Sequence, residues 1–132
     1  MKEKKMIDMA REVLNNAYAP YSNYRVGAVV ESSSGRLYTG CNIENMSFGL
    51  TVCAERVAIF KAISEGEKGF TRIVIVSDDT SIPIPCGACL QVMSEFSNDN
   101  LEIIVSSQDG RLERYRLTDL LPNPFKFYRR ER

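Results

Sequence analysis

The chain has 132 residues, in which 17 lysine and arginine residues balance 17 aspartate and glutamate residues. This length predicts a single domain over residues 1–132, and the balanced charge argues against a long nucleic-acid footprint, which needs a basic excess. No apolar run is long enough to span a bilayer, and the first residues do not resemble a signal peptide. We therefore expect a cytoplasmic protein with neither nucleic-acid nor membrane partners.

The first half of the chain predicts one helix and a β-hairpin. Apolar residues at helical spacing predict a helix over residues 3–17, and Pro20 is a natural stop after it. Residues 25–33 and 36–43 predict two strands, which the turn Ser-Ser-Gly-Arg joins into a hairpin. The segment that follows, residues 45–52, is expected to be a loop.

The second half alternates helices with buried strands. A helix over residues 53–65 is expected to end at Gly66. Residues 71–78 are a continuous β-branched run, which is typical of a central strand covered on both faces. The remaining elements are a helix, a strand and a short edge strand, at residues 87–96, 101–107 and 112–117. This order predicts one mixed sheet sandwiched between helices.

Three cysteines gather where two predicted helices begin. The chain has four cysteines and no histidine, and clustered thiols in a reducing compartment indicate metal binding or catalysis rather than disulfides. Cys86 and Cys89 form a C-x-x-C pair, and Cys53 joins them if the two helix starts are neighbours. Three thiolates suit zinc. A redox pair is the alternative, but thioredoxin-like motifs rarely place Pro before the first Cys, so the sequence favours a metal.

The two charged residues after Cys53 suit a catalytic metal site. Residues two apart do not share a helix face, so Cys53 and Glu55 can serve one site only off the N-terminal end of their helix. Three ligands leave a fourth position for water, which Glu55 can contact; a helix-dipole role alone would explain Glu55 less well beside three cysteines. Arg56 either offsets the thiolate charge by donating to sulfur or is a surface arginine, and the spacing does not choose between these.

Several segments together resemble the small, homotetrameric type of cytidine deaminase. They are PYSNYRVGA at residues 20–28, GCNIENMSFGLTVCAER at 40–56 and PCGACLQVMSEF at 85–96, with LLPNPF at 120–125 similar to the family's C-terminal segment. The resemblance implies an α/β fold, the cytidine deaminase-like three-layer sandwich with a central mixed five-stranded sheet flanked by helices. It implies one Zn²⁺ per chain on Cys53, Cys86 and Cys89, with Glu55 as the proton shuttle.

The resemblance also implies four substrate-binding residues. Asn42 and Glu44 would hold the ribose 3′-hydroxyl, since an amide and a carboxylate can donate to and accept from it. Tyr24, where the family usually has Phe, would lie against the pyrimidine. Phe125 corresponds to the aromatic residue that reaches a neighbouring subunit's site in the homotetramer.

Two residues depart from the family pattern, and one cysteine is left over. Leu90 stands where the family usually has arginine, and Phe48 where it usually has tyrosine. Both changes remove polar groups near subunit contacts. Cys41 is expected to be a small buried apolar residue, because free cysteine often behaves in this way.

The implied reaction is hydrolytic deamination of cytidine and 2′-deoxycytidine to uridine and 2′-deoxyuridine, with release of ammonia, as in pyrimidine salvage. One alternative is the deamination of a related aminopyrimidine nucleoside or antibiotic analogue. Another, from a different class, is a structural zinc-binding interaction module, in which Cys41 would be a fourth ligand. Balanced charge and the acidic Glu55 beside the metal argue against that module.

Overall fold

A computed structural model describes residues 2–126 of the chain. The elements within this range are α1 (Lys2–Leu14), β1 (Val26–Ser32), β2 (Leu37–Cys41), the 3₁₀ turn η1 (Phe48–Leu50), α2 (Ala54–Ser64), β3 (Phe70–Ser77), α3 (Gly87–Phe96), β4 (Glu102–Ser106), β5 (Leu112–Arg116) and α4 (Leu117–Leu120). Among these helices, none has both the length and the apolar character needed to cross a membrane.

The strands of the described range form one mixed sheet in the order β2-β1-β3-β4-β5. Strand β1 pairs antiparallel with β2 and with β3, so Val29 lies between Thr39 and Val74. Strand β3 pairs parallel with β4, and β4 pairs antiparallel with β5. The predicted hairpin, central strand and edge strand are therefore confirmed as β1–β2, β3 and β5.

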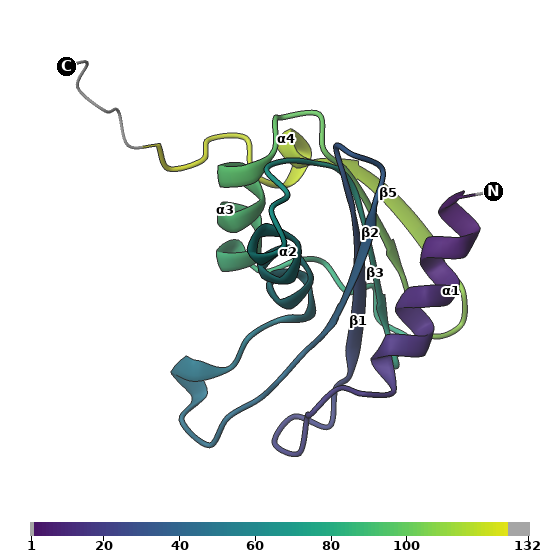
Figure 1. Ribbon diagram of the computed structural model, residues 1–132. Coiled ribbons are helices and arrows are strands. Elements are labelled where there is room, and N and C mark those ends of the chain that lie inside the picture. Colours follow the sequence, from purple (N-terminus) through teal and green to yellow (C-terminus); the bar gives the residue numbers. More distant parts are fainter. Residues whose placement is uncertain (1, 127–132) are drawn as a thin grey trace.

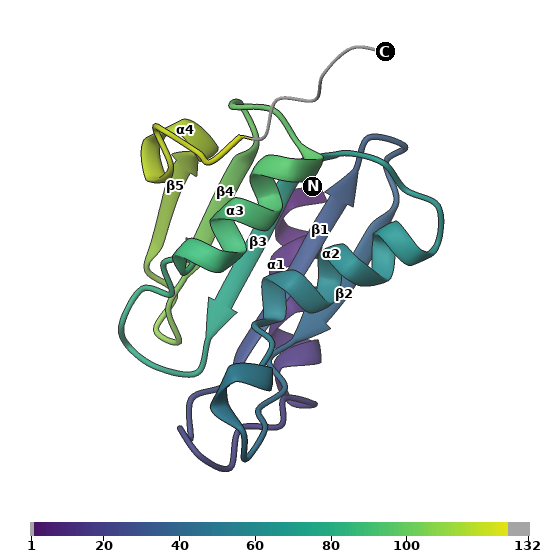
Figure 2. The same ribbon diagram turned by 90° about the vertical axis from the view of Figure 1, so that its left-hand side faces the viewer.

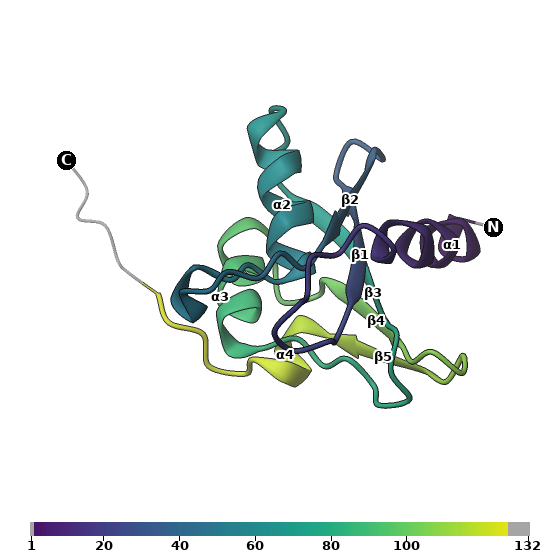
Figure 3. The same cartoon turned by 90° about the horizontal axis from the view of Figure 1, so that it is seen from below.

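Helices cover both faces of this sheet. Figure 1 shows α1 on one side and α2 and α3 on the other, and the two further views agree (Figures 2 and 3). Alternate residues of β3 explain why its run is apolar throughout: Ile73 and Ile75 pack toward α2 and α3, whereas Val74 and Val76 pack toward α1. The predicted three-layer sandwich is confirmed.

Three local differences from the sequence prediction have simple causes. Helix α1 ends at Leu14 rather than at residue 17, because the N–H groups of residues 15–17 donate to carbonyls three residues earlier in a tightened final turn. The turns η1 and α4 fall outside the predicted helices, since a single turn carries no apolar periodicity. Helix α2 ends as predicted, with Gly66 at a φ of 101°.

Two glycines allow helix backbones to touch the sheet. A Cβ on Gly27 would lie 2.1 Å from the carbonyl oxygen of Ala10 in α1, and one on Gly40 would lie 2.5 Å from the carbonyl oxygen of Ala54 and 2.5 Å from the amide nitrogen of Ala58. Ala54 is the first residue of α2. Gly40 therefore sets how close the start of α2 comes to the sheet.

We expect the substitution Gly40→Ala to destabilise the protein. The new methyl group must displace backbone atoms of α2, and overpacking of this kind costs about 1–3 kcal/mol. Urea denaturation measures the free energy of unfolding. Gly49→Ala is the matched control, because a Cβ there meets nothing within 4 Å; equal stability of the two variants would contradict the prediction.

Candidate metal and catalytic site

Three thiols meet where α2 and α3 begin. Cys53 is the N-cap of α2, Cys86 is the N-cap of α3, and Cys89 lies in the first turn of α3. The Sγ atom of Cys86 lies 3.8 Å from that of Cys53 and 3.5 Å from that of Cys89. All three sulfurs lie within 4.8 Å of one another. The structure thus brings together the three cysteines that the sequence singled out.

The spacing of these sulfurs fits a tetrahedral metal ion. Zinc–sulfur bonds of about 2.3 Å in tetrahedral geometry separate the sulfurs by about 3.8 Å. The cysteines are free rather than disulfide-bonded, and an all-sulfur donor set suits a soft or borderline divalent ion. Cys41 lies outside the group and is buried at the end of β2, and burial raises the pKa of its thiol. The expectation that Cys41 is a small buried residue is confirmed.

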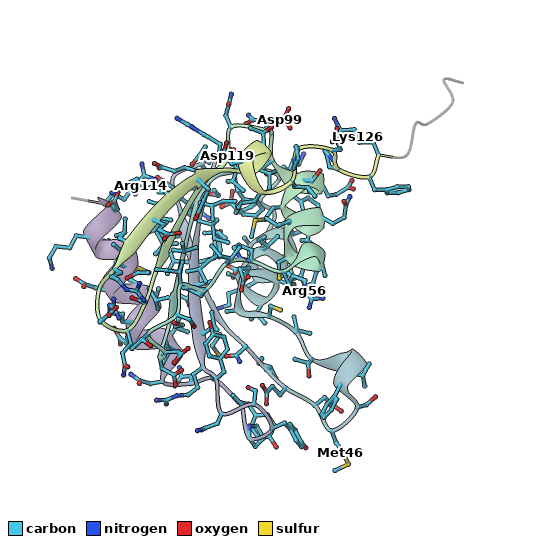
Figure 4. The ribbon with its side chains drawn as sticks, turned by 180° about the vertical axis from the view of Figure 1, so that it is seen from behind. Met46, Arg56, Asp99, Arg114, Asp119 and Lys126 are labelled. Atoms are coloured by element: carbon cyan, nitrogen blue, oxygen red, sulfur yellow. The ribbon has the colours of Figure 1, made fainter. Side chains whose placement is uncertain are left out.

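The surroundings of the cluster stabilise a negatively charged thiolate at Cys53. Hydrogen bonds from the Cys89 thiol and the Arg56 guanidinium lower the pKa of Cys53 to about 5, while the pKa of Cys89 is raised by its contact with Cys53 and by burial. Arg56 Nη2 donates to Cys53 Sγ at 3.6 Å, and Figure 4 shows Arg56 beside α3. The N-terminal ends of two helices add partial positive charge. Among the described atoms, Arg56 Nε is buried and has no hydrogen-bond partner.

Glu55 is a buried carboxyl group next to the thiols. It lies in the first turn of α2, and only 5% of its surface is exposed. Burial, with the charge of Cys53, raises the pKa of this carboxyl group to about 7. A carboxyl group that titrates near neutrality can both accept and release a proton in a reaction.

The site opens onto a cavity of about 300 Å³, which falls in the range of small-molecule sites. Cys53, Cys86 and Glu55 line it together with three other residues that the resemblance pointed to: Tyr24, Asn42 and Glu44. The remaining lining residues were not predicted from the sequence; they are Ser22, Val26, Thr51, Ala54, Ile75, Pro83 and Ile84. Pro83 and Ile84 lie three and two residues before Cys86, and that closeness to the C-x-x-C motif is the signal that could have identified them.

Asn42 ties the start of β1 to the end of β2. Its amide oxygen accepts from the backbone N–H of Val26 at 2.9 Å, and its amide nitrogen donates to the carbonyl of Tyr24 at 2.8 Å. An amide has a second N–H and a second lone pair, so Asn42 can still bind a ligand. The same bonds hold half-buried Tyr24 at the cavity wall.

Glu44 holds the neighbouring loop. Its carboxylate accepts from the backbone N–H groups of Tyr21 at 2.9 Å and Ser22 at 3.1 Å, and from the hydroxyl of Ser22. The Ser22 hydroxyl, with these backbone groups, lowers the pKa of Glu44, so the group is charged at neutral pH. A carboxylate has about four acceptor positions, which leaves room for a ligand hydroxyl.

Phe125 does not belong to this cavity. The residue is 73% exposed, and its backbone is bound to Gln91 of α3. The two departures from the family pattern do not line the cavity either: Leu90 is buried in the core next to Cys89, and Phe48 is exposed with its ring 6.0 Å from that of Tyr21. Among the candidate substrate residues, only Phe125 is therefore separate from the site of its own chain.

A mixed sheet between helices, with three thiols and a buried carboxyl group where two helices begin, defines an α/β enzyme with a site for a metal ion. The family model described as "Cytidine and deoxycytidylate deaminase zinc-binding region" matches residues 1–105. The chain belongs to the cytidine and deoxycytidylate deaminase family, whose members are hydrolases.

Individual relatives agree with this assignment. Cytidine deaminase of Sporosarcina psychrophila is 39% identical over 125 residues, which cover 95% of this chain and 92% of the relative. The crystal structure of cytidine deaminase from Burkholderia pseudomallei matches with a TM-score of 0.90 at 39% identity, covering 95% of this chain and 100% of that chain. Blasticidin-S deaminase of Bacillus cereus is 32% identical over 125 residues, which cover 89% of this chain and 87% of the relative.

We expect one divalent ion per chain, held by three thiols and not by four. Cys89→Ala should lose the ion, because it removes one sulfur of the cluster, whereas Cys41→Ala should keep it. Elemental analysis of the purified proteins makes the comparison. Loss of the ion from Cys41→Ala would indicate a closed four-thiolate site of the structural type.

Proposed function

We propose that this chain catalyses the zinc-dependent hydrolytic deamination of cytidine and 2′-deoxycytidine to uridine and 2′-deoxyuridine, with release of ammonia. The observation that carries the proposal is the buried carboxyl group of Glu55 beside a cluster of three thiols, with Glu55 and two of the thiols lining one cavity. We also propose that the chain acts as one domain in the cytoplasm, where thiols stay reduced, and that it serves pyrimidine salvage.

Cys53, Cys86 and Cys89 would hold one zinc ion, and their spacing supports this role. When bound, zinc supplies a Lewis acid that lowers the pKa of a water molecule in its open position. Arg56 would offset part of the negative charge of three thiolates, since it already donates to Cys53. These residues set the place and the charge of the reacting centre.

Glu55 would move the protons of the reaction. The carboxylate takes one proton from the water that attacks C4 of the ring and gives it to ring nitrogen N3. The second proton, from the new C4 hydroxyl group, passes through the same carboxylate to the amino nitrogen. The C4–N bond then breaks and ammonia leaves. Because Glu55 is buried, bulk water has little access to compete for these protons.

The rest of the cavity would recognise a free nucleoside. Asn42 and Glu44 each keep hydrogen-bonding capacity for the sugar 3′-hydroxyl, and the ring of Tyr24 would lie against the pyrimidine. No lysine or arginine is among the described residues that line the cavity, whereas two glutamates are. A 5′-phosphate would lack a partner there, so nucleotides and polynucleotides are expected to be poor substrates.

Two alternative functions remain to be compared with cytidine deamination, and only one of them has support from a relative. The blasticidin-S deaminase relative supports deamination of a related aminopyrimidine nucleoside or antibiotic analogue as a second candidate. Parallel assays on cytidine and on such an analogue separate the two. A structural zinc-binding interaction module is disfavoured, because a buried carboxyl group beside the thiols has no use in a closed four-thiolate site.

We further propose a homotetramer in which each site is completed by a second copy. Many large apolar side chains are exposed on one chain, and self-association would cover them. They include Tyr21, Ile43, Met46, Phe48, Leu50, Phe60 and Phe125. Met46, at 80% exposure, lies at the tip of the loop between β2 and α2 (Figure 4). Phe125 would enter the cavity of a neighbouring copy, as the family resemblance implies.

Glu55→Gln should keep the metal and lose most of the deamination. The amide cannot accept a proton from water, and positioned acid–base help is worth about 10²–10⁴-fold in rate. The absorbance change of cytidine gives the rate, and elemental analysis gives the metal content. Glu65→Gln, an exposed glutamate at the opposite end of the same helix, is the control. Near-normal turnover by Glu55→Gln would remove this residue from the mechanism.

Glu44→Ala should reduce the discrimination for a sugar 3′-hydroxyl. The wild-type protein is expected to prefer 2′-deoxycytidine over 2′,3′-dideoxycytidine by roughly tenfold, because the latter leaves the carboxylate without a partner. The ratio of the two kcat/KM values should fall toward one in Glu44→Ala. Ser22→Ala removes the hydroxyl that donates to Glu44 and accepts from the N–H of Tyr24, but it keeps the carboxylate and should therefore keep the ratio. An unchanged ratio in Glu44→Ala would assign Glu44 to loop anchoring alone.

A further inference from the structure

The described C-terminal segment after α4 is held in position by hydrogen bonds to a single side chain. The apolar residues Leu117, Leu120 and Leu121 fasten α4 to the core. Within the described part of the segment, residues 122–126, the only hydrogen bonds are two to Gln91: its amide nitrogen donates to the carbonyl of Phe125 at 2.9 Å, and its amide oxygen accepts from the N–H of Phe125 at 3.3 Å. Gln91 therefore pairs with both backbone groups of one residue.

This pairing restricts the segment strongly. Pro122 and Pro124 fix two φ angles and remove two N–H groups, so the chain between α4 and Phe125 has few conformations. The bidentate amide then fixes both the position and the direction of the backbone at Phe125. Phe125 nevertheless remains 73% exposed, which is unusual for a large apolar residue held so closely.

The pairing also directs Phe125 away from the cavity of its own chain. Gln91 follows Cys89 by two residues in α3, which turns its side chain by about 200° around the helix. Cys89 is buried, so Gln91 faces outward. Figures 1 and 4 show the segment running past α3 away from the sheet, with Lys126 beyond that helix.

We propose that Gln91 is a positioning residue, which holds the backbone of Phe125 so that its ring enters the cavity of a second copy of this chain. The inference rests on the proposed function, because that cavity is the nucleoside site. Gln91 touches neither substrate nor metal and acts only through Phe125. It also gives the helix that bears Cys86 and Cys89 a second task, the presentation of an aromatic ring to a neighbouring site.

A double-mutant cycle in the full-length, metal-loaded protein tests this role. Gln91→Leu keeps the size of the side chain but loses both hydrogen bonds, and KM for 2′-deoxycytidine should rise about fivefold with kcat unchanged. Phe125→Ala should raise KM at least as much. The double variant should match Phe125→Ala alone, because Gln91 has no effect without the ring it places. Additive effects, or a normal KM in Gln91→Leu, would overturn the proposal.

A fluorescence experiment tests the same role without using activity. The chain has no tryptophan, so Phe125→Trp introduces a single reporter at this position. In that background Gln91→Leu should shift the emission to longer wavelength and lower the anisotropy, because the ring leaves the neighbouring cavity. Gln108→Leu is the control, since Gln108 is exposed at the turn between β4 and β5 and its side chain forms no hydrogen bond within the described residues. Identical spectra with and without Gln91→Leu would refute the role.

Sedimentation and the activity of the wild-type protein separate this inference from the function it builds on. If the wild-type protein deaminates no cytidine or deoxycytidine, the proposed function fails, and the spectra still decide whether Gln91 places residue 125. If the protein sediments as an active monomer, Phe125 has no neighbouring cavity to enter, and the proposal for Gln91 is wrong while the deaminase assignment stands.

Discussion

The backbone contact between strand β2 and the first turn of α2 at Gly40 fixes the location of the chemical groups of this protein. Because no side chain separates the two, the start of α2 lies against the sheet, and Cys53 and Glu55 lie with it. The second helix start, which carries Cys86 and Cys89, must come to the same height for its sulfurs to lie within 4.8 Å of Cys53. The thiol cluster therefore depends on how closely the helix starts approach the sheet as much as on the cysteine motifs.

The members of the thiol cluster could be predicted almost completely from the sequence, because local patterns show that these cysteines stand at helix starts. The C-x-x-C spacing, the position of Cys53 and the acidic Glu55 are all readable within short windows. The continuous run at β3 likewise carries its own evidence of burial on two faces. Local patterns do not show where each helix start lies in space. The two helix starts meet only because the strands pair in the order β2-β1-β3-β4-β5.

The hydrogen bonds that Asn42, Glu44 and Gln91 make within the fold could not be derived from the sequence, because their partners are distant along the chain. Asn42 binds backbone groups 16 and 18 residues away, Glu44 binds a loop 22 and 23 residues away, and Gln91 binds a residue 34 positions away. No periodicity or motif encodes such pairs. They place the cavity wall before any ligand arrives, so little ordering of side chains remains to be done on binding.

Helix α1 lies on the face of the sheet opposite the thiols, and its core contacts are entirely aliphatic. Met6, Ala10 and Leu14 pack there on valine and isoleucine side chains of the central strands, and none of the cavity residues takes part. Since volume-conserving exchanges in such a layer usually cost little, this face can be repacked without touching the reacting groups. For protein engineering, the α1 layer is where heat resistance can be adjusted while the chemistry of the opposite face is left as it is.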